Sequence, residues 1–109
     1  MPRINTRDAA EYVADLAPFT SNGAISADFD EAGAYVVKSY STAIAVIYPD
    51  ERRAVLNGAR YSATTTQHQH HARGGARYLG FEIIEEDNPA TFESVTGYRA
   101  RLRGANGWQ

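Results

Sequence analysis

Residues 61–75 read Tyr-Ser-Ala-Thr-Thr-Thr-Gln-His-Gln-His-His-Ala-Arg-Gly-Gly, and this stretch holds all three histidines of the chain. The run from Thr64 to Gln67 matches a capping box, in which a threonine hydroxyl and a glutamine side chain satisfy each other's backbone amides at a helix start. Gly74 or Gly75 is a typical residue for a helix end. The stretch therefore predicts a short polar helix of about nine residues between a strand and a turn.

This predicted helix has little apolar surface with which to dock. The face that would meet the rest of the domain carries Thr65, His68 and Gln69 but only two small apolar side chains, Ala72 and Ala76. A helix this short is marginal in water, so buried polar contacts must help to hold it. We predict that His68 points inward and hydrogen-bonds a threonine hydroxyl or a strand carbonyl.

The composition is that of a folded domain. The chain has 109 residues, of which 43% are hydrophobic and 22% are charged, with a net charge of −2. These values predict one domain over residues 1–109. Cysteine is absent, which excludes disulfides and thiolate chemistry. No signal peptide or membrane-spanning run is recognisable, so we expect a cytoplasmic protein; a homodimer stays open.

Strand patterns flank the polar helix on both sides. A run of β-branched and aromatic residues predicts strands at 34–40 and 43–48, and a third at 54–62 interrupted at Asn57-Gly58. Before them, apolar residues at helical spacing predict a helix at about 6–17. After the polar helix, strands at 78–85 and 98–103 predict a C-terminal hairpin within an extension of about 76–104. The expected fold is α+β, with a three-stranded antiparallel meander, this hairpin and two helices.

The last predicted strand carries a stripe of arginines. Arg99, Arg101 and Arg103 alternate with Tyr98, Ala100 and Leu102, so the arginines share one face. In a hairpin with the preceding strand, Glu82 and Glu86 would lie opposite two of them, which makes structural pairing the favoured interpretation. The alternative is an exposed stripe that binds phosphates or a partner. Trp108, in the tail, either packs on the domain or marks an interface.

Charge is strongly segregated along the chain. Residues 52–81 carry five arginines and no acid. Next to a helix N-terminus, which favours anions, such a segment predicts a phosphate or nucleic-acid surface. The candidate binding residues are Arg52, Arg53, Arg60, His70, His71, Arg73 and Arg77.

Two further chemistries involve His68. Together with His71, three residues later, His68 could bind a metal, although no other residues in the sequence have the spacing of a third or fourth ligand. With Ser62, Thr64 or Thr65, it could form a nucleophile and base, although neither an oxyanion hole nor an orienting acid is recognisable. We therefore assign no catalytic residue, no metal and no cofactor.

The segment Tyr35-Val-Val-Lys-Ser-Tyr-Ser-Thr-Ala-Ile-Ala45, followed by Tyr61-Ser-Ala-Thr-Thr-Thr-Gln-His-Gln69, resembles a family of small uncharacterised proteins of actinobacterial phages, with relatives in other prokaryotes. The resemblance covers about residues 19–73. The signature Tyr-Ser-x-Thr-Thr-x-x-His-Gln is matched by Ser62, Thr64, Thr65, His68 and Gln69. This chain departs from the pattern in Ala72, where a larger aliphatic residue is expected, and in its additional His70 and His71.

The resemblance implies a phage or prophage accessory protein with no assigned activity, so no catalytic residue is carried over. Together with the charge pattern it predicts a non-catalytic binding protein in the host cytoplasm, with nucleic acid slightly ahead of a host protein as the target. The host-protein alternative includes a modulator of host defence. A small hydrolase or metal-binding protein centred on His68 is the second alternative.

Overall fold

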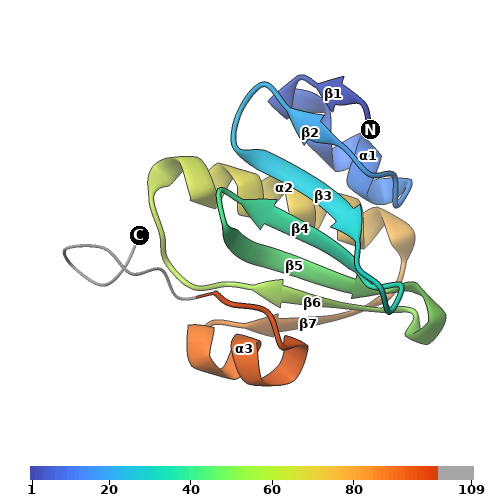
Figure 1. Cartoon of the computed structure of the whole chain (residues 1–109). Helices are drawn as coiled ribbons and strands as arrows, with labels where there is room; N and C mark the ends of the chain where they lie inside the picture. The colour runs from blue at the N-terminus through green and yellow to red at the C-terminus, as the bar shows by residue number, and fades with distance from the viewer. Residues whose placement is uncertain (101–109) are drawn as a thin grey trace.

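The computed structural model describes residues 1–100. Over this range the fold is α+β, as predicted, with three α-helices and a mixed five-stranded sheet in the order β3-β4-β5-β6-β7 (Figure 1). The strands are β3 (Ile25–Phe29), β4 (Tyr35–Ser39), β5 (Thr42–Tyr48), β6 (Arg53–Asn57) and β7 (Glu82–Glu86). A separate parallel pair is formed by β1 (Arg3–Ile4) and β2 (Thr20–Ser21).

The first four strands of the large sheet form an antiparallel meander. The strands predicted at 34–40 and 43–48 are confirmed, because β-branched and aromatic residues favour the half-buried pleated surface. The turn between β3 and β4 is closed by Asp30, whose carboxylate accepts hydrogen bonds from the backbone amides of Ala32 and Ala34. The meander has one strand more than predicted, since β3 was not recognised in the sequence.

The connection from β6 to β7 differs from the prediction. Beyond Asn57 the chain leaves the sheet instead of continuing as a strand to residue 62. It then returns through α2 (Ala63–Leu79), so β7 pairs parallel with β6, in the register Arg53 opposite Glu82. A parallel neighbour needs such a long crossover, whereas a hairpin would have required a short turn.

The predicted C-terminal hairpin is wrong. After β7 the chain forms α3 (Pro89–Thr96), whose N-cap is Asn88 and whose C-cap is Gly97. The Asn88 side chain accepts from the amide of Ala90, so the Asp-Asn-Pro turn signal is in fact a capped helix start with proline in its first turn. Residues 98–100 form no strand. The remaining predictions for this region, on Arg101, Leu102, Arg103 and Trp108, lie outside the described residues.

The segment after α3 is tied to the meander by polar contacts. The Tyr98 hydroxyl donates to Asp30 Oδ2 at 2.5 Å, and the amide of Ala43 donates to the carbonyl of Arg99 at 3.3 Å. Burial, together with the Asp30 contact, raises the pKa of Tyr98 to about 12. The same hydrogen bond is the main cause that lowers the pKa of Asp30. These contacts place residues 98–100 beside β5 and the β3–β4 turn.

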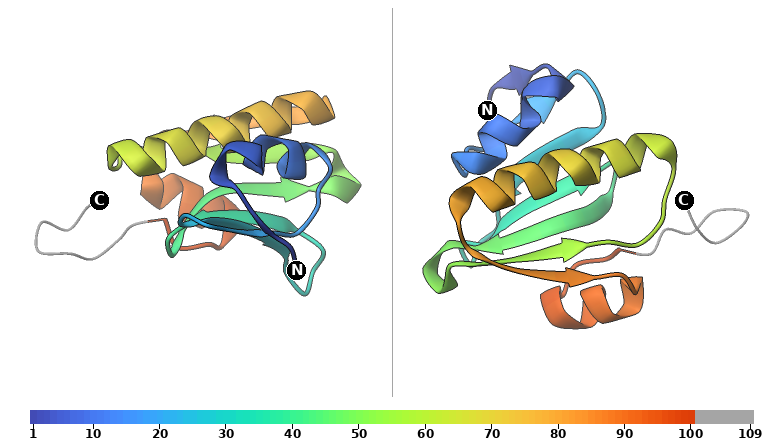
Figure 2. Two further views of the ribbon diagram at one scale, coloured as in Figure 1. Left: turned by 90° about the horizontal axis from the view of Figure 1, so that it is seen from above. Right: turned by 180° about the vertical axis from the view of Figure 1, so that it is seen from behind.

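The two faces of the sheet have different cover. The short helix α1 (Ala9–Ala14), which follows a 3-10 turn at Thr6–Asp8, lies beside α2 on one face (Figure 2). This is the N-terminal helix expected at 6–17. Helix α3 covers part of the other face, where Phe92 packs with residues such as Val46 and Val55. The mostly continuous burial of β5 follows from this cover on both sides.

Helix α2 is longer than predicted and begins elsewhere. Its N-cap is Ser62, whose side chain accepts from the amide of Thr65 at 3.3 Å, so the capping box predicted from Thr64 to Gln67 is wrong. The helix also continues through Gly74 and Gly75 to Leu79, and its C-cap is Gly80, which has the left-handed φ of 73°. The predicted glycine stop is wrong because Gly75 lies in the helix interior, where α2 crosses α1.

Candidate functional site

The buried face of α2 begins with a hydrogen-bonded cluster. Ser39 Oγ, at the end of β4, lies 2.7 Å from Nδ1 of His68 and donates to Thr65 Oγ1 at 3.1 Å. His68 is only 2% exposed and Ser39 is fully buried. His68 thus lies inside the domain, as its pattern predicts, although its partner is a serine hydroxyl rather than a threonine hydroxyl or a carbonyl. Burial, followed by the nearby His71, lowers the pKa of His68 and favours the neutral ring.

This cluster contains the residue types of a nucleophile and a base, but a substrate cannot reach them. A catalytic serine must reach a substrate, and the hydroxyl of Ser39 is closed in by β4 and α2. Of the three hydroxyl residues predicted from the sequence, Ser62 is the N-cap of α2, Thr64 is exposed and Thr65 is buried against Ser39. Within residues 1–100, no group of three histidine or acidic side chains is placed to share a metal ion. His70 is exposed on the solvent side of α2, and His71 is half-buried.

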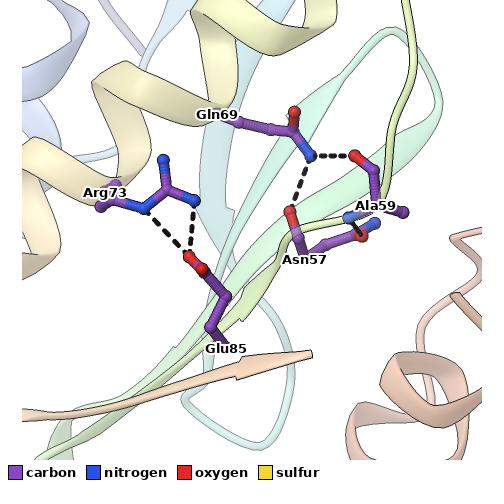
Figure 3. Close-up of polar contacts among 5 residues, drawn as sticks. All are labelled: Asn57, Ala59, Gln69, Arg73 and Glu85. Carbon is purple, nitrogen blue, oxygen red and sulfur yellow. Dashed lines mark hydrogen bonds and ion pairs between the residues drawn. The ribbon is translucent and has the colours of Figure 1, made fainter. Parts of the chain in front are cut away.

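The next turn of α2 is attached to the end of β6. The side-chain amide of Gln69 donates to two backbone carbonyls, those of Asn57 at 2.7 Å and Ala59 at 3.0 Å (Figure 3). Asn57 is itself buried and donates to the carbonyl of Ala43 and to the Tyr61 hydroxyl. Gln69 therefore satisfies carbonyls at the point where the chain leaves the sheet.

The signature residues therefore have structural contacts. Ser62, Thr65, His68 and Gln69 all take part in hydrogen bonds that join α2 to its own start, to β4 or to the end of β6. Thr64 is exposed.

Three of the candidate arginines are engaged within the domain. Arg73 pairs with Glu85 of β7, with its Nε 3.0 Å and its Nη2 2.5 Å from the carboxylate (Figure 3). Arg53 pairs with Glu51 and lies over the ring of Tyr48. The guanidinium of Arg52 lies 5.2 Å from the centre of the Phe81 ring.

The candidate binding residues do not form one cluster. Arg52 and Arg53 lie at the start of β6, whereas Arg60 follows its other end. Arg60, His70 and Arg77 are exposed, the last two on α2. Arginines that are close in the sequence thus lie at opposite ends of β6 or on α2.

A groove lies between α1 and α2, on the outer side of the helical layer. Its volume is about 420 Å³, and it is lined by Ala10, Glu11, Ala14, Asp15, Gly74 and Tyr78. The floor consists of small residues, and the aromatic ring of Tyr78 is 81% exposed beside it. A large exposed aromatic next to a concave surface is typical of protein interfaces.

No pattern in the sequence predicts this groove. The only local signal of it is the glycine pair in α2, a pattern that is also typical of a helix end. A Cβ on Gly75 would come within 2.5 Å of Val13 Cβ and 2.8 Å of the Ala10 carbonyl, so the pair marks a close helix crossing. Which helix lies across α2 is decided by tertiary contacts, and so the groove could not be read from residues 61–75 alone.

A family model matches residues 10–85, and its description is a family of unknown function, DUF8033. The chain belongs to this family. The DUF8033 match begins in α1 and ends within β7, so it includes both walls of the groove and the whole buried polar face of α2. Helix α3 lies outside it.

Neither the search of curated proteins nor that of solved structures found a match to the chain. Over residues 1–100, no helix is both long enough and apolar enough to cross a membrane.

Proposed function

We propose that this DUF8033 protein is a non-catalytic binding protein whose partner is another protein, engaged by the layer formed by α1 and α2. The observation that carries the proposal is the groove between these helices, with the 81% exposed ring of Tyr78 beside it. Aromatic residues are enriched at protein interfaces because they bury a large area at a low entropic cost.

The rest of the helical layer supports a binding role over catalysis. Ser39, Thr65 and His68, which together have the groups of a nucleophile and a base, are buried, and Ser39 hydrogen-bonds both of the others. Their chemistry is used to hold α2 on the sheet. The solvent-facing side of α1 and α2 includes the groove, the carboxylates of Glu11 and Asp15, and the ring of Tyr78, which are features that can recognise a partner.

Within this proposal, the protein is a phage-type accessory protein that acts on a host protein in the host cytoplasm, and the resemblance of residues 19–73 to actinobacterial phage proteins supports it. A protein of this size without a catalytic site can act on a host factor by occupying the surface that the factor uses to meet its own partners. Modulation of host defence is one form of this role.

Site-specific photocrosslinking tests the proposal. A photoreactive phenylalanine analogue replaces Tyr78 in the full chain, and in a matched control it replaces Val95, which is 52% exposed on α3. In an actinobacterial host, position 78 is expected to give one discrete crosslinked protein that position 95 does not. Equal crosslinking from both positions, or none from 78, would contradict a partner on the helical layer.

Nucleic-acid binding is a second candidate, favoured by the exposed arginines Arg60 and Arg77, by the exposed His70 and by the acid-free first turn of α2. This version predicts that affinity for a DNA or RNA duplex falls several-fold between about 50 and 200 mM salt, because bound counterions are released. The double variant Arg60→Gln/Arg77→Gln is expected to flatten this dependence. Affinity that does not change with salt would exclude the phosphate contacts.

A further inference from the structure

We propose that the groove between α1 and α2 binds an arginine side chain of the partner protein. This inference deepens the proposed function and rests on it. Three features of the groove carry it: an acidic wall on α1, a floor without bulky side chains, and the ring of Tyr78 on α2.

The acidic wall consists of Glu11 and Asp15, one helical turn apart on α1. Both are exposed, and no cation among residues 1–100 lies within salt-bridge distance of either carboxylate. Two like charges four residues apart repel each other and destabilise a helix. The pair therefore does not stabilise the free protein, whereas it would attract a cation from outside.

The position of Asp15 adds to this attraction. It is the C-cap of α1, and the last turn of this helix contains no basic residue. The carbonyls of Glu11, Tyr12 and Val13 at the end of α1 all accept backbone amides, so the charge of this wall comes from the two carboxylates. Glu11 and Asp15 therefore both contribute negative potential to the same wall of the groove, with no basic residue in the last turn of α1 to offset it.

The floor and the second wall suit the rest of an arginine side chain. Ala10, Ala14 and Gly74 leave room for the aliphatic stem, which can pack on their methyl groups and backbone. The ring of Tyr78 offers a face for the planar guanidinium, which the negative face of an aromatic ring attracts. Arginine suits the groove better than lysine because its guanidinium both stacks and binds carboxylates in a fork.

No packing contact within the domain requires a glycine at position 74. A Cβ at this position would lie 4.0 Å from the Cβ of Ala10, which is an ordinary contact. A glycine inside a helix is less favourable than an alanine, so Gly74 weakens α2 without a packing reason in this chain. Its missing side chain keeps the floor of the groove open. The adjacent Gly75, by contrast, is required by the contact with Val13.

An NMR titration of the full chain tests the inference. The probe is an alanine-rich helical peptide that carries two arginines one turn apart, and the matched probe has glutamine in both places. The arginine peptide is expected to shift the amide signals of Ala10, Ala14 and Gly74, and the glutamine peptide to leave them in place. The double variant Glu11→Gln/Asp15→Asn is expected to bind the arginine peptide about tenfold more weakly, through loss of the ion pairs.

Two further variants complete the test. Gly74→Leu fills the floor and is expected to abolish the shifts while circular dichroism and thermal unfolding show a folded chain. Glu31→Gln, which removes an exposed acid in the β3–β4 turn, is the control and is expected to bind as the wild type does. Equal binding of both peptides, or unchanged binding by the double variant, would overturn the inference.

Two outcomes separate this inference from the function on which it rests. Crosslinking from position 78 without any binding of the arginine peptide would overturn the arginine pocket and keep the protein-binding role. Peptide binding without a crosslinked partner would support the pocket and count against that role. A wild-type dimer that Gly74→Leu converts to a monomer would show that a second copy occupies the groove, and would overturn the inference.

Discussion

The two halves of α2 are attached to the domain by different kinds of contact. In the first half, Thr65, His68 and Gln69 hydrogen-bond Ser39 and the backbone at the end of β6. In the second half, the fully buried residues of α2 are small, with Gly75 against Val13, while Arg73 pairs with Glu85 and Leu79 packs at the edge of the core. The polar half fixes the orientation of α2 on the sheet, since hydrogen bonds are directional. The small-residue half sets the distance to α1, since steric repulsion rises steeply.

The largest expected effect is in the small-residue half. Gly75→Ala would place a Cβ 2.5 Å from Val13 Cβ and 2.8 Å from the Ala10 carbonyl, so α1 and α2 must move apart. The loss in the free energy of unfolding is expected to be about 2–3 kcal/mol, since overpacking outweighs the gain in helix propensity. Urea unfolding followed by circular dichroism measures it.

The neighbouring substitution is the matched control. Gly74→Ala adds the same methyl group where 4.0 Å is available, and is expected to raise the free energy of unfolding by about 0.5–1 kcal/mol. Equal effects of the two substitutions, in either direction, would show that the crossing with α1 does not distinguish the two positions.

A smaller effect is expected in the polar half. Gln69→Ala removes two hydrogen bonds and leaves the carbonyls of Asn57 and Ala59 without this donor. We expect a loss of about 1–2 kcal/mol in the free energy of unfolding, because unpaired buried acceptors carry the full desolvation cost. The exposed Gln67→Ala, two residues earlier, is expected to be neutral. A neutral Gln69→Ala would mean that the end of β6 is held without α2.

The smallest effect is a pH dependence from His68. Burial lowers its pKa in the folded protein, so the unfolded chain takes up a proton first as the pH falls. The stability that the neutral ring contributes is complete above the unfolded pKa, near 6.5, and is lost as the pH falls from there through the folded pKa. Chemical unfolding at a series of pH values measures this slope.

His68→Gln is expected to remove this part of the pH dependence, and His70→Gln, on the exposed side of α2, to retain it. An unchanged slope in His68→Gln would assign the pH dependence to other groups.

Local sequence patterns were enough to identify most elements. The β-branched run of residues 35–48 determined β4 and β5, because such residues fit a pleated, buried surface wherever the strand lies. Helical spacing near the N-terminus identified α1, and the polar inner face of α2 was evident from the residues alone. The burial of His68 followed from this poverty of apolar residues. These features depend on neighbours in the sequence.

Tertiary structure decided the rest. Whether Gly75 ends a helix or allows a helix crossing depends on Val13, far away in the sequence. Whether β7 joins a hairpin or lies parallel to β6 depends on the path of α2 across the sheet. The scattering of the arginines and the groove beside Tyr78 follow from the same path. A local pattern states what each segment can form, whereas the choice among partners is made by steric fit between segments distant in the chain.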